Sequence, residues 1–98
     1  MLSWLDAREE TLFGNHLAEY YDREVKKIDS RYTRKHKDKQ GKLLASIIHQ
    51  ARQYRLSHKL NIYKKAKLGN AFKWKLSDLG YDQEFIDILA KEVLLALS

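Results

Sequence analysis

The sequence predicts an all-α fold, a small bundle of about four helices in a single domain spanning residues 1–98. Apolar residues recur at spacings of three and four, as they do along one face of a helix. The chain has no proline and only four glycines, so few residues would interrupt a helix. Ninety-eight residues is also an ordinary length for one domain.

The bundle is predicted to be built on a long helical hairpin. We expect its first helix over about residues 3–33, where Gly14 indicates a kink or a close helix crossing. One apolar stripe recurs there at steps of 4, 4, 3 and 4: Leu17, Tyr21, Val25, Ile28 and Tyr32. The polar stretch KHKDKQG follows as the connection. The second helix is expected over about 42–68, and its apolar stripe rotates, which indicates either a break near Ser57 or a change of packing neighbour.

The stretch GNAFKWKLSDLG fits two structures. Phe72, Trp74 and Leu76 alternate with lysines, which is typical of a strand. Phe72, Leu76 and Leu79 also have helical spacing, and no second segment alternates as clearly to pair with a strand. We therefore predict a short third helix ending at Gly80. Glycines 41, 69 and 80 are all interpreted as boundaries between helices.

The last helix is expected to begin after Asp82, which is a good N-cap residue. Apolar residues then spread around nearly the whole helix through the segment FIDILAKEVLLAL. Such a helix is either central to the core or one half of a dimer interface.

Charge is distributed unevenly along the chain. Residues 1–30 carry four Lys or Arg against seven Asp or Glu, a net charge of −3. Residues 31–75 carry fourteen against one, a net charge of +13, and residues 76–98 carry one against five, a net charge of −4. Such asymmetry points to a polyanionic partner, DNA or RNA in particular, unless the acidic ends fold back onto the basic segment.

Within the basic segment, Arg52, Arg55 and Lys59 are spaced i, i+3 and i+7, which aligns three cations along one side of a helix. Such a row can follow phosphates, with weak sequence specificity. The full set of predicted nucleic-acid contacts is Arg34, Lys35, Lys37, Arg52, Arg55, Lys59, Lys64 and Lys65. The alternative is that the row pairs with Glu19, Asp22 or Glu24 across the helical hairpin.

Three aromatic residues, Tyr54, Tyr63 and Trp74, are interleaved with these cations. Aromatic rings can stack on unpaired bases, but aromatics at helical spacing more often belong to a core. The alternative function is a homodimer or a non-enzymatic adaptor for a protein partner. Its predicted contact residues are Phe72, Trp74, Leu94 and Leu95. Attachment to an anionic membrane surface through the basic segment is a third, weaker hypothesis.

No catalytic or cofactor-binding motif is present. The chain has no cysteine, and His16 with Glu19 supplies only two of the three or four ligands that zinc needs. There is no P-loop, no G-x-S-x-G and no other signature of a nucleophile or a small-molecule site. We therefore expect no enzyme activity, no metal and no cofactor. The sequence also lacks a signal peptide and a membrane-spanning segment, so we expect a cytoplasmic location.

Overall fold

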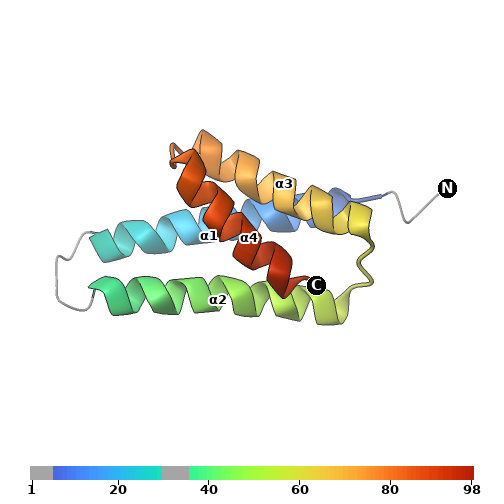
Figure 1. The fold of residues 1–98 in the computed structure, drawn as a ribbon, viewed down its shortest axis with the longest axis horizontal. Helices are drawn as coiled ribbons and strands as arrows, with labels where there is room; N and C mark the ends of the chain where they lie inside the picture. Colours follow the sequence, from blue (N-terminus) through green and yellow to red (C-terminus); the bar gives the residue numbers. More distant parts are fainter. Residues whose placement is uncertain (1–5, 30–35) are drawn as a thin grey trace.

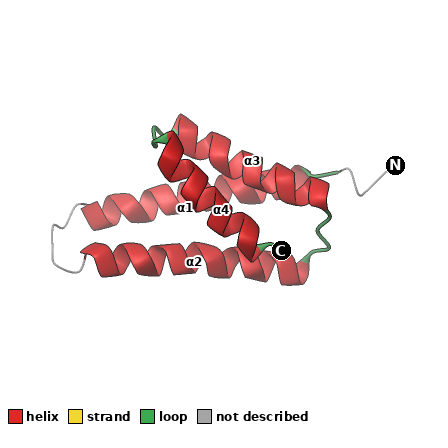
Figure 2. Ribbon diagram, viewed as in Figure 1, coloured by secondary structure: helices red, strands yellow, loops and turns green. Residues whose placement is uncertain are grey.

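Four helices of similar length make up the part of the chain that the structure describes. The computed structural model describes residues 6–29 and 36–98, with side chains at 6–27 and 41–98. The helices contain 22, 22, 17 and 14 residues and are α1 (Arg8–Asp29), α2 (His36–Ser57), α3 (Ile62–Asp78) and α4 (Gln83–Ala96). The described residues include no strand, as Figure 2 shows, and the all-α prediction is confirmed.

The helices form an elongated bundle of about 52 × 26 × 19 Å. α1 and α2 run antiparallel side by side, and α3 lies along α1 (Figure 1). α4 crosses the front of the molecule and contacts both α3 and α2. The core between them is apolar, and its largest fully buried side chains include Leu17, Ile47, Phe72, Ile86 and Leu97.

Gly14 marks a close crossing between α1 and α3. A Cβ atom at this position would lie 2.5 Å from the backbone oxygen of Leu68 and 2.9 Å from the Cβ of Ala71. Both distances are shorter than van der Waals contact, so only glycine allows the two backbones to approach this closely. Of the two predictions for Gly14, the close crossing is the one the structure supports.

The turn between α3 and α4 was the best predicted connection. Gly80 has a φ of +93°, a conformation that glycine adopts without steric cost. The Gly80 amide donates to Ser77 and the Tyr81 amide to Leu76, which is the Schellman arrangement at a helix end. The Asp82 carboxylate then accepts from the amides of Glu84 and Phe85, which confirms Asp82 as the N-cap of α4.

The predicted proportions of the hairpin were wrong. The second helix ends at Ser57, and its expected remainder joins the expected short helix to form the 17-residue α3. The Asn61 side chain accepts from the Lys64 amide at 2.8 Å, so an N-cap starts α3 within the range 42–68 that we expected for the second helix. A break near Ser57 was one of our two alternatives, and the structure supports it.

Two other boundaries also differ from the prediction. α1 begins at Arg8, whereas the start expected near residue 3 lies outside the described residues. α2 begins at His36 rather than after the KHKDKQG stretch. Gly41 and Gly69, expected at helix ends, lie within α2 and α3. At Gly69 a Cβ would lie 2.9 Å from the Leu94 side chain, so this glycine serves the packing of α4 on α3. The predicted end of the first helix, residues 30–33, lies outside the described residues.

Candidate functional site

The predicted cationic row lies at the end of α2. Arg52 and Arg55 are on its last two turns and Lys59 is in the connection to α3, and all three side chains are exposed. The Arg55 guanidinium donates to the backbone oxygen of Ser98 at 3.1 Å. The row therefore borders the end of α4, which reaches the same part of α2 in Figure 1. α4 packs beside the row and leaves it open to solvent.

Two of the three acids that we considered as partners of this row, Asp22 and Glu24, are engaged elsewhere, and Glu19 forms no ion pair with a described residue. Asp22 pairs with Lys26 at 2.8 Å and Glu24 with Lys27 at 2.9 Å, both within α1. The Lys26 hydrogen bond, followed by the one from the Tyr81 hydroxyl, holds the pKa of Asp22 below its usual value. Among the described residues, neither Arg52 nor Lys59 forms an ion pair.

Lys64 lies close to acidic residues at the start of α1. It lines an open hollow of about 330 Å³ together with residues of the α1 start: Asp6, Arg8, Glu9 and Glu10. The pKa of Asp6 is lowered chiefly by hydrogen bonds from Arg8, with a smaller contribution from the charge of Lys64. The fold-back of acidic residues onto the basic segment thus reaches the start of α3, and through Glu9, which lies 3.4 Å from the His58 ring, it also reaches the connection before α3. Lys64 is less exposed than the cations of the row.

A buried contact between α1 and α2 holds the end of α2 in place. The Tyr54 ring stacks on Phe13 and His58, with centroid distances of 4.2 and 3.9 Å. Its hydroxyl donates to the buried Glu10 carboxylate at 2.6 Å, a short charge-assisted hydrogen bond. Burial, followed by this bond, raises the pKa of Tyr54. Sequence reasoning missed Glu10, because no local pattern marks a carboxylate whose partner lies 44 residues away.

Other predicted contacts are more scattered. Lys65 is half-buried on α3. Arg34 and Lys35 lie outside the described residues, and of Lys37 only the backbone is described, in the first turn of α2.

Of the predicted row, Arg52 and Arg55 lie about one turn apart on α2, whereas Lys59 lies beyond the end of that helix at Ser57. The expected alignment of all three cations along one helix was therefore wrong for Lys59, because the helix ends before it.

The predicted partner-interface residues fall into two groups. Phe72 is fully buried in the core, so it does not contribute to a surface, because it faces inward on the same helical stripe as Leu68 and Leu76. Leu94 and Leu95 are exposed at 37% and 58%. They line a shallow groove of about 360 Å³ with Lys73 and Lys91.

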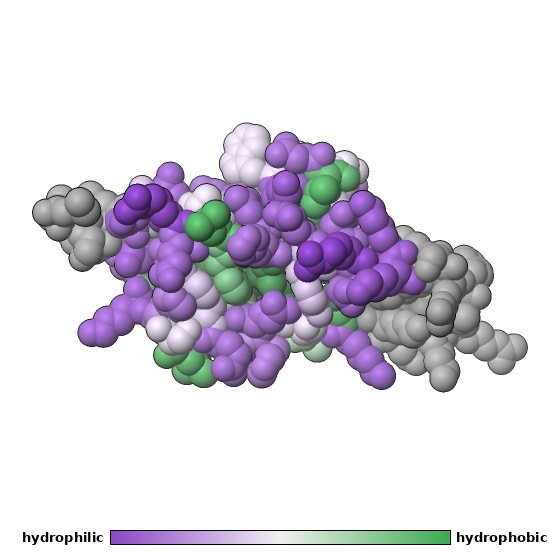
Figure 3. All heavy atoms as spheres, turned by 180° about the vertical axis from the view of Figure 1, so that it is seen from behind, coloured by the Kyte–Doolittle hydropathy of each residue, from purple (hydrophilic) through white to green (hydrophobic). Residues whose placement is uncertain are grey.

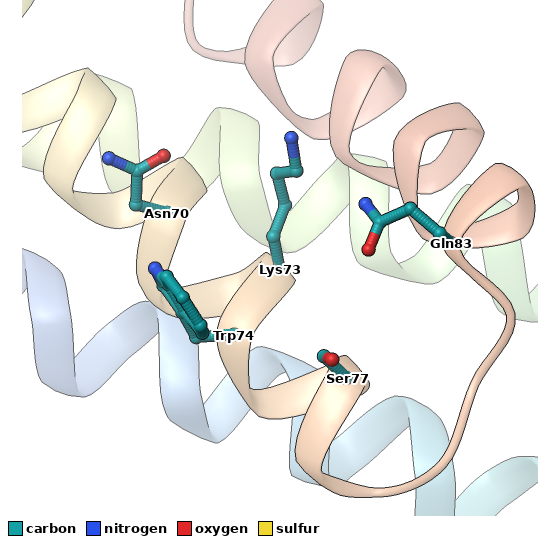
Figure 4. A pocket seen from close by; sticks show the side chains of 5 residues that line it. All are labelled: Asn70, Lys73, Trp74, Ser77 and Gln83. Atoms are coloured by element: carbon teal, nitrogen blue, oxygen red, sulfur yellow. The ribbon is translucent and has the colours of Figure 1, made fainter.

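The sequence also left open whether Trp74 belongs to the core or to the surface. Of the three aromatics interleaved with cations, Tyr54 belongs to the core, whereas Tyr63 and Trp74 are 39% and 71% exposed. Figure 4 shows Asn70, Lys73 and Trp74 projecting from α3, with Gln83 facing them from the start of α4. With Ser77 these residues line a hollow of about 270 Å³.

Comparison of the chain with protein-family models, with curated proteins and with solved structures gave no match. Within residues 6–29 and 36–98, no group of three acidic or histidine side chains is placed to hold a metal ion. No helix in this part of the chain has the length and apolar character to cross a membrane.

Proposed function

We propose that the protein binds nucleic acid, DNA or RNA, through phosphate contacts with weak sequence specificity. The observation that carries the proposal is the row of Arg52, Arg55 and Lys59, which is exposed and unpaired with the acids of α1. Cations arranged in this way release counterions condensed on a phosphate backbone, which drives binding. The +13 charge of residues 31–75 supports the same proposal, because it would attract a polyanion from a distance.

A salt titration tests this proposal. Binding to a labelled duplex should weaken steeply with salt, because each phosphate contact contributes about −0.9 to the log–log slope. The triple variant Arg52→Ala, Arg55→Ala, Lys59→Ala should lower the size of the slope by about two to three units. A control with equal charge loss on α1, Arg8→Ala, Arg23→Ala, Lys27→Ala, should change it less. If the wild-type chain bound neither a duplex nor a single strand at low salt, the proposal would be overturned.

A second candidate function is self-association through the outer face of α4. Ile88 and Leu95, one heptad apart, are 62% and 58% exposed on the side of α4 opposite its core residues. Lys91 and Glu92 lie on opposite flanks of this apolar line. In a parallel two-fold pair, Lys91 of one copy would face Glu92 of the other at both flanks. The opposite face of the molecule is mostly hydrophilic (Figure 3).

A further inference from the structure

Trp74 is an exposed aromatic ring that packs against no other ring of the described part of the chain. It is 71% exposed, and no ring or cation of the described residues stacks on it. The neighbouring exposed ring differs in this respect, since the Lys67 ammonium lies 5.6 Å from the centroid of Tyr63. Leaving a large apolar face in water brings no stability to the chain, and tryptophan is among the residues most enriched at binding sites.

The outer face of α3 continues this site along the helix. The residues of one exposed stripe recur at steps of 4, 3, 4 and 3: Tyr63, Lys67, Asn70, Trp74 and Ser77. It combines two rings, a cation and two small polar groups. At 1.5 Å per residue, the two aromatic positions are about 16 Å apart, with Lys67 between them. This pattern was available in the sequence, and the burial of the opposite stripe of α3 shows that it faces outward.

The surroundings of Trp74 supply polar groups at the edge of the ring. Asn70 is exposed and forms no hydrogen bond with a described residue. Gln83 donates to the Asp87 carboxylate at 2.9 Å, and Lys73 pairs with the same carboxylate at 3.3 Å. The negative charge of Asp87 is thereby compensated, and the hydrogen bond from Gln83 and then that from Lys73 lower its pKa. The pocket is thus lined by amides, a hydroxyl and a cation.

We propose that Trp74 is a stacking platform for an unpaired base of single-stranded nucleic acid, with Asn70 and Gln83 placed to contact the edge of the base. This inference rests on the proposed function and specifies its substrate class. An open hollow of about 270 Å³ is smaller than the roughly 300–1,000 Å³ of small-molecule pockets. It suits one flat group laid against the indole, and base–aromatic stacking is sequence-tolerant because every base has a π-face.

Charge favours a nucleic acid over an aromatic side chain of a protein. α3 carries five lysines against one acid, Asp78. Phosphates on either side of a stacked base would therefore meet a cationic helix, with Lys67 on the same stripe as Trp74. A base buried within a duplex presents no free face to the indole, so the site should prefer single strands.

The indole itself reports on the proposal. The chain has two tryptophans, so Trp4→Phe leaves Trp74 as the only one. Three probes of equal length are compared: a 12-nucleotide thymidine strand, an abasic strand with the same phosphates, and a duplex. We expect the thymidine strand to quench the Trp74 fluorescence and the other two to bind without quenching it. Equal binding of all three probes without quenching would overturn the stacking role and leave phosphate binding intact. This result is the one expected if Trp74 contacts a protein partner instead of a base.

A set of variants measures the contribution of the ring. In the wild-type background, Trp74→Ala should weaken binding of the thymidine strand by about tenfold or more, with little change for the abasic strand. Trp74→Phe should restore part of the loss, because it keeps an aromatic face. Leu12→Ala, which truncates an exposed apolar side chain on α1, is the matched control. An equal loss of affinity for both strands in Trp74→Ala would contradict stacking. Absence of binding to any probe would instead refute the proposed function itself.

Discussion

Tyr54 joins two helices through one ring and one hydroxyl. It stacks between Phe13 of α1 and His58, the residue after α2, and it supplies the hydrogen-bond donor for the buried Glu10 carboxylate. A buried carboxylate without a donor is costly. The position of the cationic row at the end of α2 therefore depends on a contact that carries no part of the proposed binding.

Removing this hydroxyl should destabilise the fold. Tyr54→Phe keeps the ring stack and deprives Glu10 of its donor, so we expect a loss of about 1–3 kcal/mol in the free energy of unfolding at pH 7. Tyr63→Phe, which removes an exposed hydroxyl, should change stability by less than about 0.5 kcal/mol. Urea denaturation measures both, and equal stabilities of the two variants would contradict the assigned contact.

The same contact has a pH signature. Because the folded state raises the pKa of Tyr54, its stabilising effect is complete below the unfolded tyrosine value of about 10 and is lost as pH rises above it. The stability difference between wild type and Tyr54→Phe should therefore shrink above about pH 10. A difference that stayed constant to higher pH would show that the hydroxyl ionises equally well in the folded chain.

At the scale of elements, two glycines within helices allow a direct comparison. Gly14 faces the backbone of α3, whereas a Cβ at Gly41 would have no atom within 4 Å. Alanine favours a helix by up to about 1 kcal/mol over glycine. We therefore expect Gly41→Ala to stabilise the protein by up to that amount.

Gly14→Ala should have the opposite effect. The new methyl group would force α1 and α3 apart, at a cost of about 1–3 kcal/mol that exceeds the gain in helix propensity. Thermal and urea denaturation of the two variants, side by side, checks the difference in sign. A Gly14→Ala protein as stable as wild type would mean that α3 packs farther from α1 than the structure places it.

At the scale of the whole molecule, the second candidate function, self-association through the outer face of α4, can be tested by mutation. Exchanging Ile88 and Leu95 for lysine should abolish any concentration-dependent dimer seen by light scattering, while Leu12→Lys, at an exposed site on α1, should not. Lys91→Glu should weaken the dimer by placing acids together at both flanks, and adding Glu92→Lys should restore it. A wild-type chain that stays monomeric at high concentration would rule out this candidate.

Local patterns predicted most of what depends on neighbouring residues. The helical class, the Asp82 cap and the Gly80 turn each rest on interactions within a few residues, so the sequence alone indicated them. The spacing of Arg52 and Arg55 on one side of α2 is equally local, whereas Lys59 lies beyond the end of the helix. The break at residues 58–61 was harder to predict. The apolar stripe rotates near Ser57, whereas the N-cap that starts α3 is Asn61, so the two local signals do not coincide.

Only the packing of the helices settled which charged and aromatic groups are available for binding. Whether Arg52 meets an acid of α1, and whether Trp74 is core or surface, depends on which helix covers which stripe. Those choices are made by contacts across tens of residues, such as Gly14 against Leu68 and Tyr54 against Glu10. The composition of the chain established a surplus of cations. The tertiary structure determined which of the described cations and aromatic rings remain exposed.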